Sequence, residues 1–178
     1  MTTTLIDFSD PAGAAAFAAI DDRIMGGVSA SRMCFDKAGH AVFEGEVSLD
    51  NGGGFASVRS APGDYRAAGA TCYLLTVCGD GKRYRLNLRM DGDFDGINYR
   101  ASFNTSAGQW QTVRLCLTDF EPSFRGRAVP DALPLDPARV QQIGLMIAAR
   151  QAGPFKLSVK TLEAGTETTS TLPPRGTA

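Results

Sequence analysis

Hydrophobic and polar residues alternate along much of the chain, which is the pattern of strands with one face buried and the other in water. The clearest case is the segment 83–90, and the segment 98–105 repeats it. The inward positions are Tyr84, Leu86, Leu88 and Met90 in the first segment and Tyr99, Ala101 and Phe103 in the second. Gly92 and Gly96 fall between the segments, where a turn would use them. The two segments are therefore predicted to pair as an antiparallel hairpin.

Further segments have the composition of strands, and turn residues separate nearly all of them. They are 31–35, 41–49, 55–60, 71–78, 110–117, 143–149 and 155–162. The segment 41–49 should pair with 31–35 across the Asp36–Gly39 turn. Its inward residues are expected to be Ala41, Phe43, Val47 and Leu49. Helical patterns are limited to an alanine-rich stretch at 11–20, with Asp10 as its cap, and a single turn at 137–142.

Short strands separated by turns exclude a parallel α/β sheet and predict an all-β fold of two packed antiparallel sheets. A jelly-roll β-sandwich with one or two short helices fits this pattern best. The chain has 178 residues, of which 43% are hydrophobic and 21% are charged, so it is long enough to bury a single core. We place one domain at 1–163. Residues 164–178 are rich in Thr, Ser, Gly and Pro and are predicted to form a flexible C-terminal tail.

The net charge and the lengths of the hydrophobic runs limit the kinds of partner that the chain is expected to bind. Lys and Arg (18) nearly balance Asp and Glu (19), which leaves a formal charge of -1, so nucleic acid is not an expected partner. No hydrophobic run is long enough to cross a bilayer, and the first residues do not read as a targeting leader. We therefore expect a cytoplasmic protein with no membrane span.

The residue types that metal sites and active sites need are scarce. The four cysteines form no Cys-x-x-Cys pair and His40 is the one histidine, so we predict no metal site and no cofactor. Cys72 and Cys78 would lie about 20 Å apart in one strand, so reduced thiols are expected. His40 has no partnered nucleophile, and the acids Asp91 and Asp93 lie beside a glycine, as turn residues do. We predict that the chain is not an enzyme.

Two glycine-bearing segments depart from the strand pattern and are candidates for binding. The segment 21–29 places Asp21, Asp22 and Arg23 ahead of two glycines. It indicates either a tight turn pinned by an Asp–Arg pair or a site for a hard cation. The segment 50–59 contains three consecutive glycines but lacks the Lys-Ser or Lys-Thr and the helix of a phosphate loop. It is interpreted as a bend between strands, with Arg59 oriented by an acid.

The third segment outside the strand pattern is 119–127, which combines two phenylalanines and two arginines with Pro and Gly. Exposed aromatic residues beside arginine are typical of protein interfaces. Alternatively, Phe120 and Phe124 pack beneath the loop as a local core. The sequence leaves both interpretations open.

The polar side of the predicted hairpin is a fourth candidate. Its members are Arg83, Arg85, Asn87, Arg89, Asn98, Arg100, Ser102 and Asn104. Such a face either receives a sugar or an acidic partner, or is the solvated outer face of a sheet. A carbohydrate-binding surface that includes Arg89, Arg100 and Trp110 is the alternative function. Trp110 itself is interpreted as a core residue, and the low aromatic content of 8% weighs against sugar binding.

Several of these motifs, in this order, carry a resemblance to a known family. They are Asp21–Ser29, Asn51–Arg59, Gly79–Tyr84 and Phe124–Arg127, followed by Ile143–Ile147 and Gln151–Phe155. Together they resemble the complex I intermediate-associated protein family over the span from Ile6 to Leu162. The resemblance implies a galactose-binding-like jelly roll and, for mitochondrial members, a role in the assembly of respiratory complex I. Without an evident leader, this chain looks like a stand-alone bacterial relative.

The expected function is therefore that of a non-catalytic, protein-binding module. The partner is expected to be a respiratory-complex subunit or an assembly intermediate, with the chain serving as an assembly factor or chaperone for NADH:quinone oxidoreductase. The residues expected to bind are Asp22, Arg23, Asn51, Arg59, Phe124 and Arg125.

Overall fold

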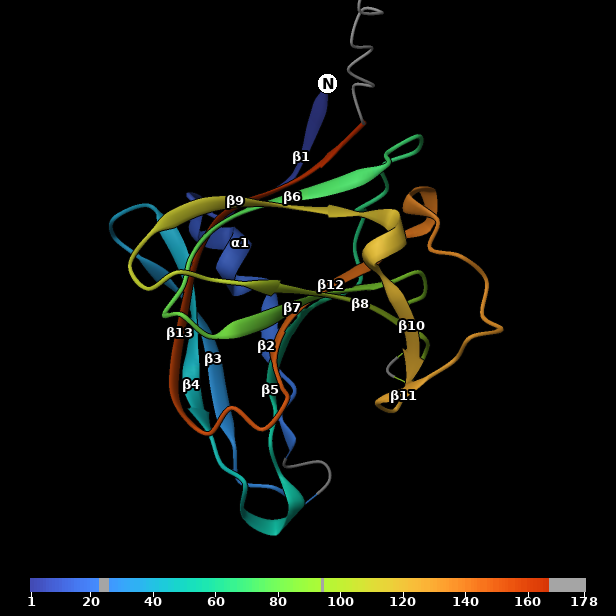
Figure 1. Cartoon of the computed structure of the whole chain (residues 1–178). Coiled ribbons are helices and arrows are strands. Elements are labelled where there is room, and N and C mark those ends of the chain that lie inside the picture. Colours follow the sequence, from blue (N-terminus) through green and yellow to red (C-terminus); the bar gives the residue numbers. More distant parts are fainter. Residues whose placement is uncertain (23–25, 94, 167–178) are drawn as a thin grey trace, which may run out of the picture.

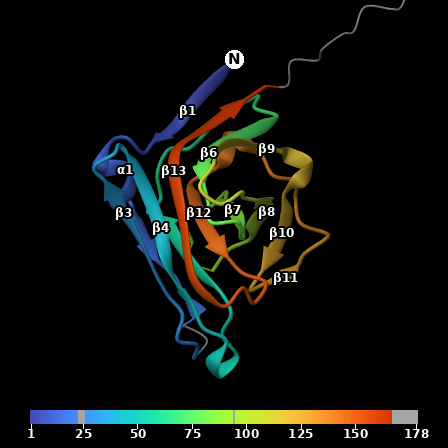
Figure 2. The same cartoon turned by 60° about the vertical axis from the view of Figure 1, so that its left-hand side comes forward.

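A computed structural model describes residues 1–22, 26–93 and 95–166 of the chain, which form two antiparallel sheets packed face to face (Figure 1). The first sheet has the order β3-β4-β13-β6-β9, and β1 also pairs with β13. The second sheet has the order β11-β10-β8-β7-β12-β5-β2. Figure 2 shows the same arrangement from another side, with β3 and β4 far from β10 and β11. The predicted all-β sandwich is confirmed.

The elements of the six-stranded sheet are β1 (Thr2–Asp7), β3 (Ala30–Asp36), β4 (His40–Val47), β6 (Cys72–Cys78), β9 (Trp110–Cys116) and β13 (Gly153–Gly165). Those of the seven-stranded sheet are β2 (Phe17–Ala19), β5 (Ala56–Ser60), β7 (Arg83–Arg89), β8 (Asn98–Asn104), β10 (Glu121–Phe124), β11 (Arg127–Ala128) and β12 (Gln142–Ile147). The described helices are α1 (Pro11–Ala15) and the 3-10 turns Asp50–Gly52, Leu117–Asp119 and Pro137–Arg139. Within the described ranges, no helix has the length and hydrophobicity that crossing a membrane requires.

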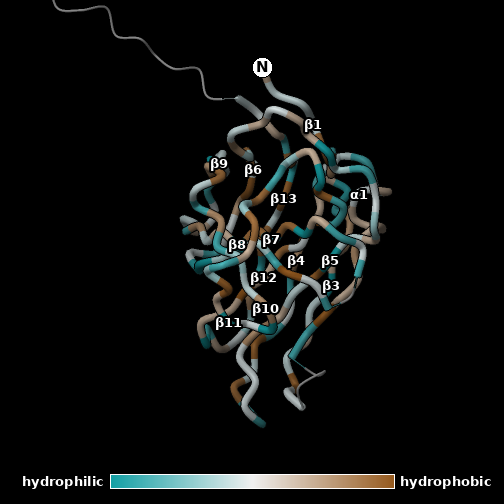
Figure 3. Tube along the Cα trace, turned by 90° about the vertical axis from the view of Figure 1, so that its right-hand side faces the viewer, coloured by the Kyte–Doolittle hydropathy of each residue, from teal (hydrophilic) through white to brown (hydrophobic). Residues whose placement is uncertain are grey.

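Both predicted hairpins form, with the inward faces expected from the alternation. Tyr84 pairs with Phe103 and Leu86 with Ala101 in the hairpin of β7 and β8. Met33 pairs with Phe43 in the hairpin of β3 and β4. The hydropathy colouring in Figure 3 shows brown and teal segments alternating along the strands. The inward residues of the two sheets form one hydrophobic core, to which Phe43, Leu75 and Leu157 contribute from one sheet and Tyr84, Leu86 and Leu145 from the other.

The alanine-rich stretch at 11–20 differs from its prediction in its second half. Asp10 caps α1 by accepting the N–H of Ala12, as expected, but the helix ends at Ala15. Phe17 is buried, packs 5.8 Å from the ring of Phe8 and pairs with Ser60 as the start of β2. Sheet pairing and core packing here outweigh the helix preference of alanine.

Several side chains and boundaries also differ from the prediction. Leu49 lies beyond the end of β4 and is 36% exposed, so its predicted burial is wrong. Trp110 is 47% exposed and is not a core residue. The last strand continues to Gly165, which pairs with Thr2, so regular structure extends two residues past the expected boundary at 163. Residues 167–178 of the expected tail lie outside the described residues.

Candidate functional site

The two aspartates of the first glycine-bearing segment are buried hydrogen-bond acceptors. Asp22 is 1% exposed, and its carboxylate accepts the N–H of Ser29 at 2.9 Å, the hydroxyl of Ser29 at 2.6 Å and the N–H of Gly54 at 2.8 Å. Asp21 accepts the N–H groups of Ser31 and Ser57, each at 3.0 Å. We call Asp21 and Asp22 the acid cluster. The acid cluster links the beginning of β3, and the residues just before it, to the beginning of β5 and the residues just before that strand.

The electrostatics and the local space agree with a structural role for the acid cluster. Burial raises the pKa of Asp22, but the hydrogen bonds from Ser29, Gly54 and Phe55 outweigh it, so the net pKa is lowered. A Cβ atom at Gly27 or Gly53 would lie 2.4 or 2.5 Å from an atom of the Asp22 carboxylate. The two glycine motifs are therefore needed so that backbone can surround one carboxylate. Serine and amide donors pin the turn, and Arg23 of the expected Asp–Arg pair lies outside the described residues.

Of the other two residues predicted to bind near this turn, the structure describes Asn51 but not Arg23. Asn51 is exposed and adopts a positive φ of 55° inside the 3-10 turn, which asparagine tolerates better than most residues. Arg23 lies outside the described residues. In the parts of the chain that the structure describes, no three His, Cys, Asp or Glu side chains are grouped to hold a metal ion.

The outer side of the seven-stranded sheet gathers arginines from three strands. Arg85 is opposite Ser102, Asn87 is opposite Arg100, and Gly144 of β12 lies between Asn87 and Arg59. We call this surface the arginine face, with members Arg59, Arg83, Arg85, Arg89 and Arg100. The predicted alignment of the polar residues of β7 and β8 is confirmed by this register.

The arginine face differs from a solvated sheet surface because several of its polar groups are buried. Asn87 is 8% exposed and Gln142 is 6% exposed. Their side-chain oxygens, Oδ1 and Oε1, are buried and have no hydrogen-bond partner among the described residues. An unsatisfied buried acceptor costs about 1–3 kcal/mol. The face therefore carries polar groups whose hydrogen bonding is incomplete.

The arginines of this face also repel one another. Burial and the neighbouring Arg89 lower the pKa of Arg59 to about 10. Burial, followed by the charges of Arg100 and Arg83, lowers the pKa of Arg85. Within the described residues, the guanidinium groups of Arg83, Arg85 and Arg100 form no hydrogen bond or ion pair. Positive charge is thus concentrated on one side of a chain whose net charge is -1.

A groove of about 740 Å³ runs from the arginine face to the edge of β9. We call it the arginine groove, because Arg83, Arg85, Arg100 and Arg114 line it. Asp119 and Glu121 lie at its side, and residues 111–115 of β9 form one wall. Phe103 is the one aromatic residue among the described lining residues, and it is 5% exposed.

The third sequence candidate, 119–127, lies at the rim of the arginine face. Phe120 is buried against Tyr73, with ring centroids 5.7 Å apart, whereas Phe124 is 39% exposed. Phe120 therefore packs as a local core residue, and Phe124 has the exposure that an interface residue needs. Arg125 forms an ion pair with Asp95 of the turn between β7 and β8, and its guanidinium carbon lies 5.3 Å from the Phe124 ring centroid. Asp95 in turn attracts Arg89, which links this rim to the face.

The predicted binding residues therefore separate into two places. Arg59, Phe124 and Arg125 belong to the arginine face and its rim, whereas Asp22 contacts, and Asn51 belongs to, the segment 51–55 that precedes β5. The alternative sugar surface also divides. Arg89 and Arg100 lie on the seven-stranded sheet, but Trp110 packs against His40, 5.3 Å away, on the outer face of the six-stranded sheet. The structure does not bring these three together.

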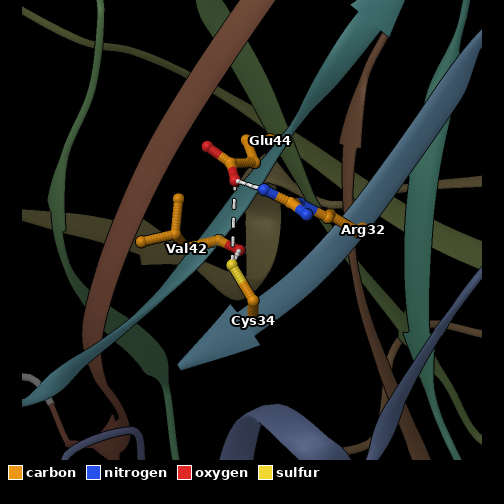
Figure 4. Close-up of polar contacts among 4 residues, drawn as sticks. All are labelled: Arg32, Cys34, Val42 and Glu44. Atoms are coloured by element: carbon orange, nitrogen blue, oxygen red, sulfur yellow. Dashed lines mark hydrogen bonds and ion pairs between the residues drawn. The ribbon is translucent and has the colours of Figure 1, made fainter. Parts of the chain in front are cut away.

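A second groove, of about 760 Å³, lies on the six-stranded sheet and contains an ion pair. Arg32 contacts Glu44 at 2.6 Å across β3 and β4 (Figure 4). The thiol of Cys34 donates weakly to the carbonyl of Val42 and to Glu44. Burial, followed by Glu44, raises the pKa of Cys34, so the thiol is held in its unreactive form. Arg32 of this groove thus has a carboxylate partner, whereas Arg83, Arg85 and Arg100 of the arginine groove form no ion pair within the described residues.

The sequence identified Arg85 and Asn87 as members of a polar face, but their role as crowded or unsatisfied groups was missed. Gln142 and Arg114 were missed altogether. The alternation of β7 and β8 was the available signal for the face, whereas Gln142 and Arg114 come from β12 and β9, and the alternation does not predict that these strands lie beside the face.

Comparisons with known proteins agree on the fold and the family. The chain is 28% identical over 157 residues to the mitochondrial Complex I intermediate-associated protein 30 of Drosophila melanogaster, and it spans about half (52%) of that protein's length. The matched region makes up 75% of this chain. Among solved structures, the family 11 carbohydrate-binding module of the Clostridium thermocellum cellulase Lic26A-Cel5E is similar, with a TM-score of 0.69, 16% identity and coverage of 94% of this chain and 95% of that one.

The same family 11 module in complex with a mixed-linked tetrasaccharide gives a TM-score of 0.67 at 17% identity, covering 93% of this chain and 95% of that one. At such low identity these structures establish a shared fold alone. The sequence profile of the Complex I intermediate-associated protein 30 family, in contrast, matches residues 6–159. This match spans the residues of the acid cluster and of the arginine face, and the chain belongs to the Complex I intermediate-associated protein 30 (CIA30) family.

Proposed function

We propose that this chain is a non-catalytic protein-binding module that assists the assembly of respiratory NADH:quinone oxidoreductase, and that its binding surface is the arginine face with its rim. The observation that carries the proposal is the position and the contacts of Arg83, Arg85 and Arg100. They line one groove and form no ion pair within the described residues, and the carboxylate of Glu121 in that groove attracts Arg85 without pairing with it.

Energetic arguments support a binding role for this face. Crowded, partly desolvated cations destabilise a folded chain unless an anion offsets their charge. A partner that brings carboxylates would relieve the repulsion, and its donors would satisfy the buried oxygens of Asn87 and Gln142. Membership of the CIA30 family supports respiratory complex I as the assembly in which that partner is found.

The exposed pair at the rim fits the same role. Phe124 and Arg125 project from the turn between β10 and β11, and arginine with an aromatic residue is a common combination at interface hot spots. The ion pair between Arg125 and Asp95 holds the turn against the β7–β8 connection. Side chains that are already oriented lose less entropy on binding.

The carbohydrate alternative has weaker support. Sugar-binding surfaces use exposed aromatic rings for stacking, and Trp110 lies on the other sheet from Arg89 and Arg100. The fold shared with family 11 modules shows only how the strands are arranged.

The proposed function is tested by affinity purification of the tagged full chain from its native host, with quantitative mass spectrometry of the recovered proteins. We expect complex I subunits to be enriched with the wild-type chain and at least tenfold less with Arg85→Glu/Arg100→Glu. Phe124→Ala/Arg125→Ala should also reduce their recovery.

A charge-matched control is Lys156→Glu/Lys160→Glu, which places the same change of charge on exposed residues of the six-stranded sheet. This variant should recover complex I subunits as well as the wild type does. Equal recovery by the arginine variant and the control would contradict the assigned surface. Absence of complex I subunits from every sample would contradict the assembly role.

A further inference from the structure

The edge of β9 that faces the arginine groove is open to pairing. In the six-stranded sheet β9 pairs with β6 and ends the strand order on that side. Native edge strands are commonly protected by proline, lysine or a bulge. The seven residues of β9, Trp110–Cys116, contain no proline and a single charged residue, and their pairing with β6 shows no register shift.

The register shows which peptide groups of β9 point outward. The N–H of Leu117 donates to the carbonyl of Thr71, so every second residue from Leu117 backwards bonds to β6. The peptide groups of Thr112 and Arg114 therefore point away from β6, into the edge. This register leaves the N–H and C=O of Thr112 unbonded to β6.

This open edge and the arginines belong to the same groove. Residues 111–115 form its wall, and Arg83, Arg85 and Arg100 project from the outer face of the neighbouring β7 and β8. An extended peptide placed along β9 would turn alternate side chains toward the arginines, because side chains of a strand alternate with a period of two residues. Acidic residues at every second position would match both features at once.

We propose that the arginine groove binds an acidic, extended segment of a partner protein, which adds to the edge of β9 as a further strand. This inference rests on the proposed protein-binding function and specifies the chemistry of the partner. The backbone of the segment bonds to the outward peptide group of Thr112, and its carboxylates meet Arg83, Arg85 and Arg100.

A polypeptide fits this groove better than an acidic polysaccharide does. A strand edge presents donors and acceptors alternately in a spacing that another peptide backbone reproduces. A polysaccharide would match the charges but not this spacing, and the groove offers it no exposed aromatic ring among its described lining residues. The test must therefore distinguish binding of an acidic polysaccharide from binding of a peptide.

The direct test uses the full chain and a synthetic peptide, acetyl-Glu-Thr-Glu-Val-Glu-Thr-Glu-amide. The chain has one tryptophan, Trp110, at the start of β9, so its fluorescence reports binding to that strand. We expect saturable one-to-one binding that weakens as salt is added. Arg85→Glu/Arg100→Glu should weaken binding at least tenfold, whereas Lys156→Glu/Lys160→Glu should leave it unchanged.

Two further measurements isolate the backbone contribution. Thr112→Pro removes an outward N–H and blocks the edge, while Thr112→Ala keeps the edge intact; proline is tolerated at such outward edge positions. We expect at least tenfold weaker binding for Thr112→Pro and less than twofold change for Thr112→Ala. The second measurement changes the peptide and leaves the protein unchanged. A peptide N-methylated at alternate residues keeps every carboxylate but loses backbone N–H donors, so it should bind at least tenfold more weakly.

The outcomes distinguish this inference from the proposed function. Equal binding of the N-methylated and unmodified peptides would overturn strand addition. Polygalacturonate binding with the same dependence on Arg85 and Arg100, together with no peptide binding, would overturn the choice of a protein segment. If complex I subunits are recovered in an arginine-dependent way but the peptide does not bind, strand addition is wrong and the assembly function stands. If the peptide binds as described but no complex I subunit is recovered, the groove assignment stands and the assembly function is wrong.

Discussion

The acid cluster and the arginine face both include charged side chains that are buried or half-buried, but their surroundings are opposite. Asp22 is enclosed by donors from Ser29, Gly54 and Phe55. Arg85 faces other arginines and has no ion-pair partner within the described residues. A buried charge whose bonds are complete holds the fold together, whereas crowded charges with incomplete bonding are available to a ligand.

This comparison teaches that a conspicuous motif is not by itself a binding site. The glycine-bearing segments with Asp21 and Asp22 stood out most in the sequence, and they serve the internal geometry of the fold. The arginines of β7 and β8 looked like an ordinary solvated strand face. Their grouping with β9 and β12 makes them the stronger candidate.

The largest effect should come from removing the centre of the acid cluster. Asp22→Ala would leave the N–H groups of Ser29 and Gly54 buried without their acceptor. By analogy with breaking a buried charged network, we expect the unfolding free energy to fall by about 3–5 kcal/mol. Urea denaturation followed by circular dichroism measures it. Asp64→Ala, at an exposed ion pair with Arg66, is the control and should change little; comparable losses in both variants would refute the structural role of Asp22.

A smaller loss is expected when a methyl group enters the space beside Asp22. Gly53 has an ordinary φ of -65°, so Gly53→Ala tests steric room alone. Its Cβ would meet Asp22 at 2.5 Å and the carbonyl of Ser48 at 2.8 Å, and overpacking of this kind costs about 1–3 kcal/mol. Gly92→Ala, whose Cβ has no neighbour closer than 3.5 Å, provides the matched control in the same denaturation assay. If both alanine variants unfold at the same urea concentration, the space around Asp22 is not tight.

The acid cluster should also make stability depend on pH in a defined direction. The folded-state pKa of Asp22 lies below its ordinary value of 3.8, so the unfolded chain binds the proton more tightly. The contribution of Asp22 is therefore present above the ordinary value and is lost as the pH falls through the folded-state pKa. Urea midpoints measured from pH 6 to pH 3 should fall less steeply for Asp22→Asn than for the wild type. Parallel curves would show that Asp22 titrates alike in both states.

The smallest effect on stability is expected at the arginine face. Arg85→Gln removes a charge that Arg100 and Arg83 repel, and solvent screens the half-exposed side chain. We expect the unfolding free energy to stay within about 1 kcal/mol of the wild type, with any change toward greater stability. The same variant should bind the acidic peptide more weakly. A clear loss of stability would show that Arg85 stabilises the fold as Asp22 does. The two regions would then not differ in role.

The sequence by itself determined the strands and their faces. Alternation along 83–90 and 98–105 predicted the hairpin of β7 and β8, because a strand buried on one side must repeat every two residues. The same rule could not find β2, since Phe17 becomes a strand residue only through its pairing with Ser60 and its contact with Phe8. The family resemblance rested on motifs whose order the chain preserves, and the match over residues 6–159 confirms it.

Only the tertiary structure decided which charges meet. That Asp22 accepts from Gly54, 32 residues away, and that Gln142 lies beside Arg89 across β12 and β7 depends on how the sheets are ordered. Likewise, Trp110 turned outward and away from Arg100 because β9 belongs to the other sheet. Periodicity fixes the face of a residue within its own strand, but the neighbours across strands follow from long-range pairing, which a local pattern does not encode.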